Sequence, residues 1–105
     1  MNIYVDYLMK NFGGTDFKGL FQIGKILEIY NLEEYNITTI YKSFDQNYNN
    51  GASSERNIRY YINYITNKYG LEEIEKKLKC KCLGDKFTNK EFMLAVKYRA
   101  EELYG

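Results

Sequence analysis

The side chains best suited to recognition chemistry lie between residues 53 and 69, where arginine and asparagine recur among isoleucines. The guanidinium groups of Arg56 and Arg59 can each donate two hydrogen bonds to guanine O6 and N7, and the amide of Asn63 can bind N6 and N7 of adenine. A paired contact of this kind discriminates against a wrong base by about 1–3 kcal/mol. The residue types and their spacing therefore indicate recognition of base edges in a nucleic acid.

Catalytic chemistry has little support in the composition. The chain contains no histidine, which removes the commonest general base and a frequent zinc ligand. The only cysteines are Cys80 and Cys82, and a closed zinc site needs four ligands, so a metal would have to be shared between two copies. We expect instead that both sulfurs act as small apolar groups. No enzymatic activity, metal or cofactor is expected.

The apolar spacing predicts that residues 53–69 form one helix with a single buried side. Ile58, Ile62, Ile65 and Tyr69 fall within a sector of about 60° when projected down a helix. The opposite side is expected to face solvent, although any amphipathic helix of a soluble protein also places polar residues outward, so a merely solvated face is the alternative. The outward side holds Arg56, Arg59, Tyr60, Asn63 and Asn67.

The charge of this helix distinguishes it from the rest of the chain. Fifteen Lys and Arg against fourteen Asp and Glu give a net charge of +1, which is too small by itself to indicate a nucleic-acid partner. The outward face, by contrast, combines Arg56, Arg59 and Lys68 with one acid, Glu55. This local excess of positive charge favours binding to a nucleic acid.

The preceding residues predict a helix-turn-helix. Residues 37–48 carry apolar side chains with the three-and-four spacing of a helix, and Asn49-Asn-Gly51 follows, where Asn and Gly tolerate the positive φ of a tight turn. In a helix-turn-helix the second helix enters the major groove of DNA. Ser53 or Ser54 is expected to cap that helix, where hydroxyls and free N–H groups also suit a phosphate.

The remaining pattern predicts a mainly α fold of about five to six helices in a single domain, residues 1–105. Further segments are expected at about 3–11 and 16–30, both helical, and at 71–78, as a short helix or a turn. Thr15 or Asp16 is expected to cap the second of these helices. Thr88 and Glu91 form a T-x-x-E capping box, which predicts the start of a final helix.

Residues 78–88 leave two alternatives open. Residues 78–83 alternate apolar and basic side chains, as in a small β-hairpin that would form a basic wing beside the helix-turn-helix. The other alternative is a helix end followed by a loop without strands. In either arrangement three lysines can contact the phosphate backbone or the minor groove, or can simply be solvated. They are Lys79, Lys81 and Lys86.

Three segments resemble a known family. Residues 55–62, Glu-Arg-Asn-Ile-Arg-Tyr-Tyr-Ile, are similar to the E-R-x-I-R-x-x-I stretch in the recognition helix of the C-terminal effector domain of the master sporulation response regulator. Phe17-Lys-Gly19 and Thr88-Asn-Lys-Glu-Phe92 resemble its I-K-G and T-N-S-E-F segments, in the same order and at similar spacing. The resemblance covers residues 14–103 or so. It implies an all-helical domain, built round a helix-turn-helix, that binds a short promoter element, often as paired copies on neighbouring half-sites.

The resemblance also has limits that bear on function. Arg56 and Arg59 are the positions that carry over most directly. The receiver domain of the family, with its phosphorylated aspartate, has no counterpart in these residues, so control by phosphorylation is not implied. Gly51-Ala-Ser53 differs from the family at the start of the recognition helix, and so the target sequence does not carry over. Lys79-Cys-Lys-Cys82, the basic segment of the predicted wing, is a further departure.

The sequence thus predicts a sequence-specific, double-stranded DNA-binding protein that regulates transcription, as a homodimer or as paired copies on DNA. Two alternatives remain: an accessory protein that marks an origin of plasmid transfer or replication, and a protein-interaction module that mimics the effector domain. Stacking of Tyr60, Tyr61 and Tyr64 on single-stranded bases is less favoured, because the isoleucines between them indicate a packed helix. The predicted DNA contacts are Ser53, Ser54, Arg56, Asn57, Arg59, Tyr60, Asn63, Lys68, Lys79, Lys81 and Lys86.

The expected location is the cytoplasm. No run approaches the roughly 18 apolar residues of a membrane span. The N-terminal residues also lack the basic and apolar regions of a secretory signal peptide. We therefore expect no membrane partner.

Overall fold

The computed structural model describes residues 2–105. This part of the chain is mainly α, as expected, and contains no β-strand. Its helices are α1 (Ile3–Asn11), α2 (Lys18–Ile29), α3 (Ile37–Tyr48), α4 (Ser54–Tyr69), α5 (Leu71–Leu78) and α6 (Asn89–Tyr104). None of the helices in this described part is both long enough and apolar enough to cross a membrane.

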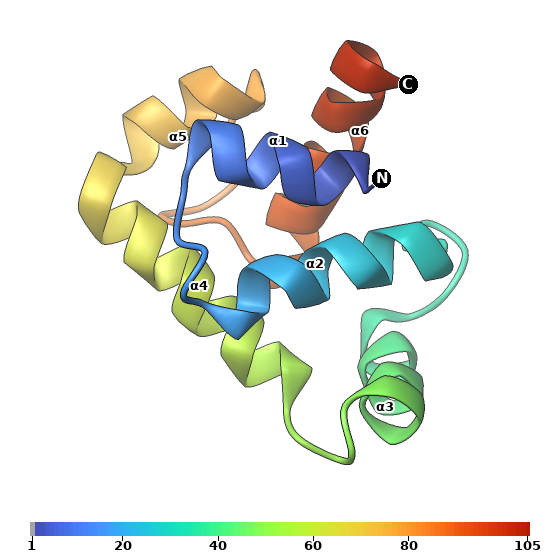
Figure 1. Ribbon diagram of the computed structural model, residues 1–105. Helices are drawn as coiled ribbons and strands as arrows, with labels where there is room; N and C mark the ends of the chain where they lie inside the picture. Colours follow the sequence, from blue (N-terminus) through green and yellow to red (C-terminus); the bar gives the residue numbers. More distant parts are fainter. Residues whose placement is uncertain (1) are drawn as a thin grey trace.

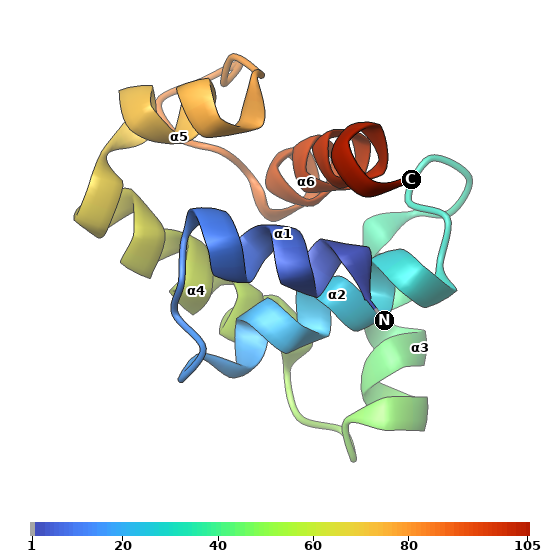
Figure 2. The ribbon, with the colours of Figure 1, turned by 45° about the horizontal axis from the view of Figure 1, so that its top comes forward.

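The helices enclose one apolar core. Figures 1 and 2 show α1 and α2 side by side, with α4 passing the start of α2 and α6 packed against α1. Phe12, directly after α1, is fully buried and contacts both Tyr69 and Phe92, with ring centres 6.0 and 5.9 Å apart. Because these rings come from the two ends of the chain and from α4, they hold α4 against the body of the molecule.

Gly19 determines how closely α2 approaches α4. It is buried in the first turn of α2, and a Cβ atom there would collide with the backbone carbonyl of Asn57 and come within 2.9 Å of Cβ of Tyr61. Only a residue without a side chain allows two backbones to come this close. The Phe17-Lys-Gly19 segment therefore has a packing role beneath α4.

The turn between α3 and α4 is fixed by a side chain of α3. The Asp45 carboxylate accepts the backbone N–H of Ser54 at 3.1 and 3.2 Å from its two oxygens. Asn50 and Gly51 have φ values of 49° and 78°, which confirms the positive φ predicted for this turn. Ser53, rather than Ser54, is the N-cap, since its hydroxyl accepts the N–H of Arg56 at 3.2 Å.

The predicted start of α2 was wrong. The helix begins at Lys18, the N-cap position is Phe17, and neither Thr15 nor Asp16 caps it. The Phe17 ring packs on Tyr64 and Tyr61 instead, with centroid distances of 4.5 and 6.0 Å. Burial of this aromatic ring against α4 fixes the entry of the chain into α2, and the residues before it remain an exposed turn.

No wing is present in the described residues, because 78–88 contains no strand. α5 is the short helix of the two alternatives, and it ends at Lys79 in the left-handed conformation, with φ 52°. The Glu75 carboxylate then accepts the N–H of Cys82 at 2.8 Å, which takes a donor that a hairpin would need. Leu83 is 91% exposed, so the apolar residues of the alternating segment have no sheet face to cover.

The start of α6 agrees with the prediction. The Thr88 hydroxyl accepts the N–H of Glu91 at 3.1 Å, and the Glu91 carboxylate accepts the N–H of Thr88 at 2.9 Å. This bond to the Thr88 backbone lowers the pKa of Glu91. Phe87 and Phe92 form the accompanying apolar contact, with ring centres 6.3 Å apart. The residues just before α6 are therefore held in a defined position beside α4.

Candidate nucleic-acid interface

α4 separates its apolar and polar side chains as predicted. Ile58, Ile62 and Ile65 are at most 5% exposed and lie in the core. Tyr61, which the helical projection did not place in the buried sector, is fully buried and donates its hydroxyl to the Gly13 carbonyl at 2.9 Å. The opposite side is solvent-exposed, and we call it the α4 surface. It consists of Arg56, Arg59, Tyr60, Asn63 and Asn67.

The charged groups of the α4 surface are not neutralised by neighbouring carboxylates. Within residues 2–105, the ion pairs all have Lys97 or Arg99 of α6 as the cation, with Glu33, Glu101 and Glu102 as the carboxylates. Neither Arg56 nor Arg59 is within 4.0 Å of a carboxylate in this part of the chain. Their guanidinium donors therefore remain available to an external acceptor.

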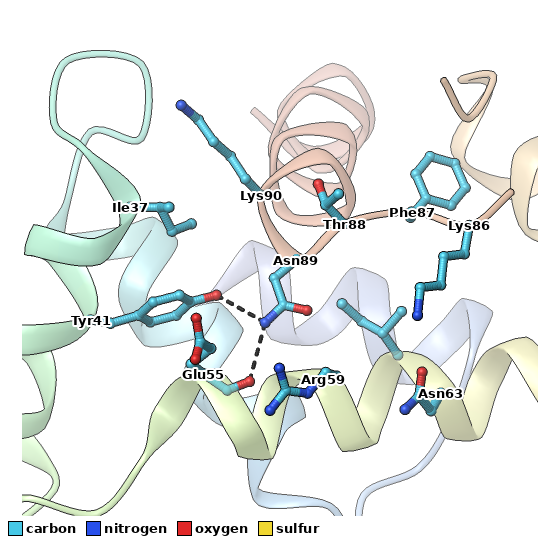
Figure 3. A pocket seen from close by; sticks show the side chains of 11 residues that line it. Ile37, Tyr41, Glu55, Arg59, Asn63, Lys86, Phe87, Thr88, Asn89 and Lys90 are labelled. Carbon is cyan, nitrogen blue, oxygen red and sulfur yellow. Dashed lines mark hydrogen bonds between the residues drawn. The ribbon is translucent and has the colours of Figure 1, made fainter. Parts of the chain in front are cut away.

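A hollow of about 400 Å³ adjoins one edge of the α4 surface. It lies between α4, α3 and the residues that lead into α6 (Figure 3). Arg59 and Asn63 project from α4 on one side, and Lys86 extends toward them from the other. Lys90 also lines the hollow but extends away from α4. The hollow thus gathers cations from two segments that are about 30 residues apart in the sequence.

Asn89 ties the walls of this hollow together. Its Nδ2 donates to the Tyr41 hydroxyl and to the backbone carbonyl of Glu55, each at 3.1 Å (dashed lines in Figure 3). α6 is thereby joined to α3 and α4 at one point. Burial of the Tyr41 ring raises its pKa to about 12. Asn89 is not among the residues predicted from the sequence, although it lies in the Thr88–Phe92 segment that resembles the regulator family.

Two of the predicted contact residues are less exposed than the residues of the α4 surface. Ser54 is fully buried, and its N–H is already bonded to Asp45, so it offers a phosphate nothing. Asn57 is half-buried, and its backbone carbonyl faces Gly19 of α2. Their exposure is reduced because Gly19 of α2 lies against the Asn57 backbone and Asp45 of α3 binds Ser54. Ser53 is only partly exposed and its hydroxyl is used as the cap.

Lys68 is exposed on the flank of α4 that faces the loop between α1 and α2, away from the hollow. Its Nζ lies 3.4 Å from the Tyr64 hydroxyl and 5.2 Å from the centre of the Tyr69 ring. The bond to Tyr64 raises the pKa of Lys68. This lysine therefore remains charged beside an aromatic pair, separate from the cations of the hollow.

The three lysines of the predicted wing are divided between two places. Lys86 lines the hollow beside α4, whereas Lys79 and Lys81 line a different one together with Lys76, Glu72 and Glu75. The two carboxylates reduce the positive potential there. Cys80 and Cys82 are free thiols, and the described residues contain no group of three metal-ligating side chains.

The site therefore combines the exposed polar side of α4 with a hollow at its edge whose walls are partly polar and partly apolar, the apolar part including Ile37, Ile62 and Phe87. It presents guanidinium, ammonium, amide and phenol groups, which are donors and acceptors suited to bases and phosphates. Comparisons of the chain with protein-family models, with curated proteins and with solved structures gave no match. Its function must be inferred from this geometry.

Proposed function

We propose that this protein binds double-stranded DNA in a sequence-specific manner, with α4 in the major groove. The observation that carries the proposal is the α4 surface, in which Arg56, Arg59 and Asn63 share one exposed side of a 16-residue helix and form no ion pair in the described residues. A helix of this kind fits the roughly 12 Å width of the major groove. The buried isoleucines on the opposite side of α4 hold the helix against the core, so that the two arginines and Asn63 all face solvent.

The connection between α3 and α4 supports this placement. Recognition helices contact base edges mainly through residues near their N-terminus. Arg56 and Arg59 lie in the first two turns of α4, close to the turn that Asp45 fixes. With α3 and the turn in this arrangement, the first half of α4 would be the part that enters the major groove.

Regulation of transcription, as a homodimer or as paired copies on neighbouring half-sites, is the role we propose for this activity. The resemblance of residues 55–62 to a promoter-binding recognition helix supports it. A bacterial regulator of this kind acts in the cytoplasm, without catalysis or a cofactor.

The tyrosines of α4 favour duplex over single-stranded DNA. Tyr61 is buried and Tyr64 is half-buried against Phe17, so only Tyr60, at 55% exposure, has a ring free to stack. Single-strand binding depends on several aromatic rings that stack on successive bases. One ring beside two arginines is more suitable for contact with a groove wall.

Selection from a pool of random duplexes tests the proposal, because enrichment of one motif reveals both binding and half-site spacing. Arg59→Ala is expected to weaken binding to the enriched site by about 10- to 100-fold, the equivalent of one bidentate base contact. Binding to random duplexes should change far less. Lys76→Ala on α5 is the matched control and should leave both affinities nearly unchanged.

Two results would contradict the proposal. An equal loss of affinity on enriched and random duplexes would remove Arg59 from base recognition. Failure of the wild-type protein to enrich any motif, with no salt-dependent retention on DNA, would instead favour a protein-interaction module.

A further inference from the structure

We propose that the hollow between α4 and the start of α6 seats a phosphodiester group of the duplex, on the strand that borders the bases contacted by α4. This inference rests on the proposed function and assigns a second, sequence-independent contact to it. Lys86 and Lys90 are the groups that would hold the phosphate, with Arg59 at the border of the hollow. Lys90 had not been singled out by the sequence.

The charge around the hollow favours an anion. Arg59, Lys86 and Lys90 line it, against the single carboxylate of Glu55. Since the ion pairs of the described residues involve only Lys97 and Arg99 as cations, none of these three positive groups is held in an ion pair, although the Lys90 side chain extends away from α4. Like charges held near one another repel, and an anion between them relieves that repulsion.

The walls of the hollow are held in place before any ligand arrives. Phe87 is only 6% exposed and anchors the residue next to Lys86 in the core. On the other side of the capping Thr88, Asn89 is bonded to Tyr41 and to the Glu55 carbonyl at 3.1 Å. The backbone that carries Lys86 and Lys90 is therefore fixed relative to α4. A phosphate bound here would set the register of α4 along the groove.

The position of the hollow indicates a duplex backbone rather than a base. Arg59 and Asn63 stand at its border and also belong to the α4 surface. A helix in the major groove is flanked by the sugar-phosphate strands that form the groove walls. With α4 inserted, the strand beside Arg59 would pass over the hollow. The other predicted phosphate contacts, Lys79 and Lys81, lie in a separate hollow beside two carboxylates.

The test is the double variant Lys86→Ala/Lys90→Ala, measured by fluorescence anisotropy with the enriched duplex and a random duplex over a series of salt concentrations. Each lost phosphate contact lowers the slope of log affinity against log salt by about 0.9. We expect a loss of affinity on the order of 10-fold on both duplexes, and a slope smaller by about 1–2. The enriched motif should stay the same.

Lys10→Ala/Lys76→Ala is the matched control, since it removes the same charge from exposed positions on α1 and α5. It should reproduce only the small effect of net charge. Glu55→Gln provides the opposite change: removal of the one carboxylate at the hollow should tighten binding several-fold on both duplexes. All four replaced lysines are exposed, and circular dichroism verifies that each variant is folded.

The outcomes separate this inference from the proposed function. If wild-type protein binds DNA but the Lys86/Lys90 variant behaves like the control, the hollow holds no phosphate. A loss confined to the enriched duplex would assign these lysines to base recognition and would also overturn the inference. If inorganic phosphate at constant ionic strength displaces the duplex from the wild-type protein, the hollow is a site for the free anion, and the assignment to a phosphodiester group is overturned. Absence of any binding by the wild-type protein overturns the proposed function itself.

Discussion

Single residues determine where α4 lies against the core, and therefore which of its side chains are exposed. Gly19 lets α2 lie directly against the backbone of Asn57, on the side of α4 away from the exposed Arg56 and Arg59. A side chain at position 19 would push α4 away from the core. The surface that we propose reads DNA is therefore positioned by a residue that cannot itself contact DNA.

Gly19→Ala is expected to destabilise the protein by about 1–3 kcal/mol, because overpacking forces the surrounding backbone to shift. The new Cβ would meet the Asn57 carbonyl and Tyr61, neither of which can move aside as a flexible side chain could. Urea unfolding followed by circular dichroism measures the change. Gly84→Ala is the control, since no atom lies within 4 Å of a Cβ there. Equal stability of the two variants would show that the contact of α2 with α4 is less tight than described.

Elements whose ends are marked by local hydrogen bonds could be predicted from the sequence, and those fixed by distant contacts could not. The conformations of the Thr88 and Glu91 capping box and of the turn at Asn50 each depend on four or fewer neighbouring residues. The start of α2, by contrast, depends on the Phe17 ring and its packing on α4. Likewise, residues 78–83 alternate like a strand but lack a partner strand, so no hairpin forms.

The same distinction applies to the candidate site. The exposed side of α4 could be predicted from helical periodicity alone, because the spacing of the isoleucines determines which side of the helix is buried. The hollow was not predicted, because tertiary packing of α6 against α4 is what places Lys86, Asn89 and Lys90 at its walls. Ser54 was misplaced for a related reason: only the structure reveals that Asp45 takes its N–H.

The turn between α3 and α4 supplies a prediction at the scale of the element. Asp45→Ala should cost about 1.5–3 kcal/mol, because it removes a charged acceptor and leaves the buried N–H of Ser54 without a partner. Denaturant midpoints measure the loss, with Asp85→Ala in the exposed segment before α6 as the control. Unchanged stability in Asp45→Ala would mean that the turn is maintained without this carboxylate.

The whole molecule depends on a core rich in tyrosine. Tyr7, Tyr41 and Tyr61 are each at most 7% exposed, and their hydroxyls bond to partners on other segments, such as the carbonyls of Lys77 and Gly13. Burial raises the pKa of Tyr7 to about 12, and burial also raises the pKa of Tyr61. The folded state therefore keeps these phenols neutral at a pH where they would ionise in an unfolded chain.

Stability should consequently decline at alkaline pH. The stabilisation from the raised pKa values is fully present below the unfolded value of 10.0 and is lost as pH rises toward about 12, because the unfolded chain releases the protons first. Denaturant midpoints measured across this range should fall steadily. In parallel, tyrosinate absorbance should show the three buried phenols ionising only as the protein unfolds. A constant midpoint would contradict the assigned burial of these three rings.

The most direct test of the central claim is a nuclear magnetic resonance titration of the isotope-labelled protein with the enriched duplex. DNA bound through α4 should shift the amide signals of Arg56, Arg59, Asn63 and the residues from Lys86 to Lys90, and leave those of α1 and the last turns of α6 almost unchanged. Shifts concentrated on α1 and the end of α6, with α4 unaffected, would contradict the account.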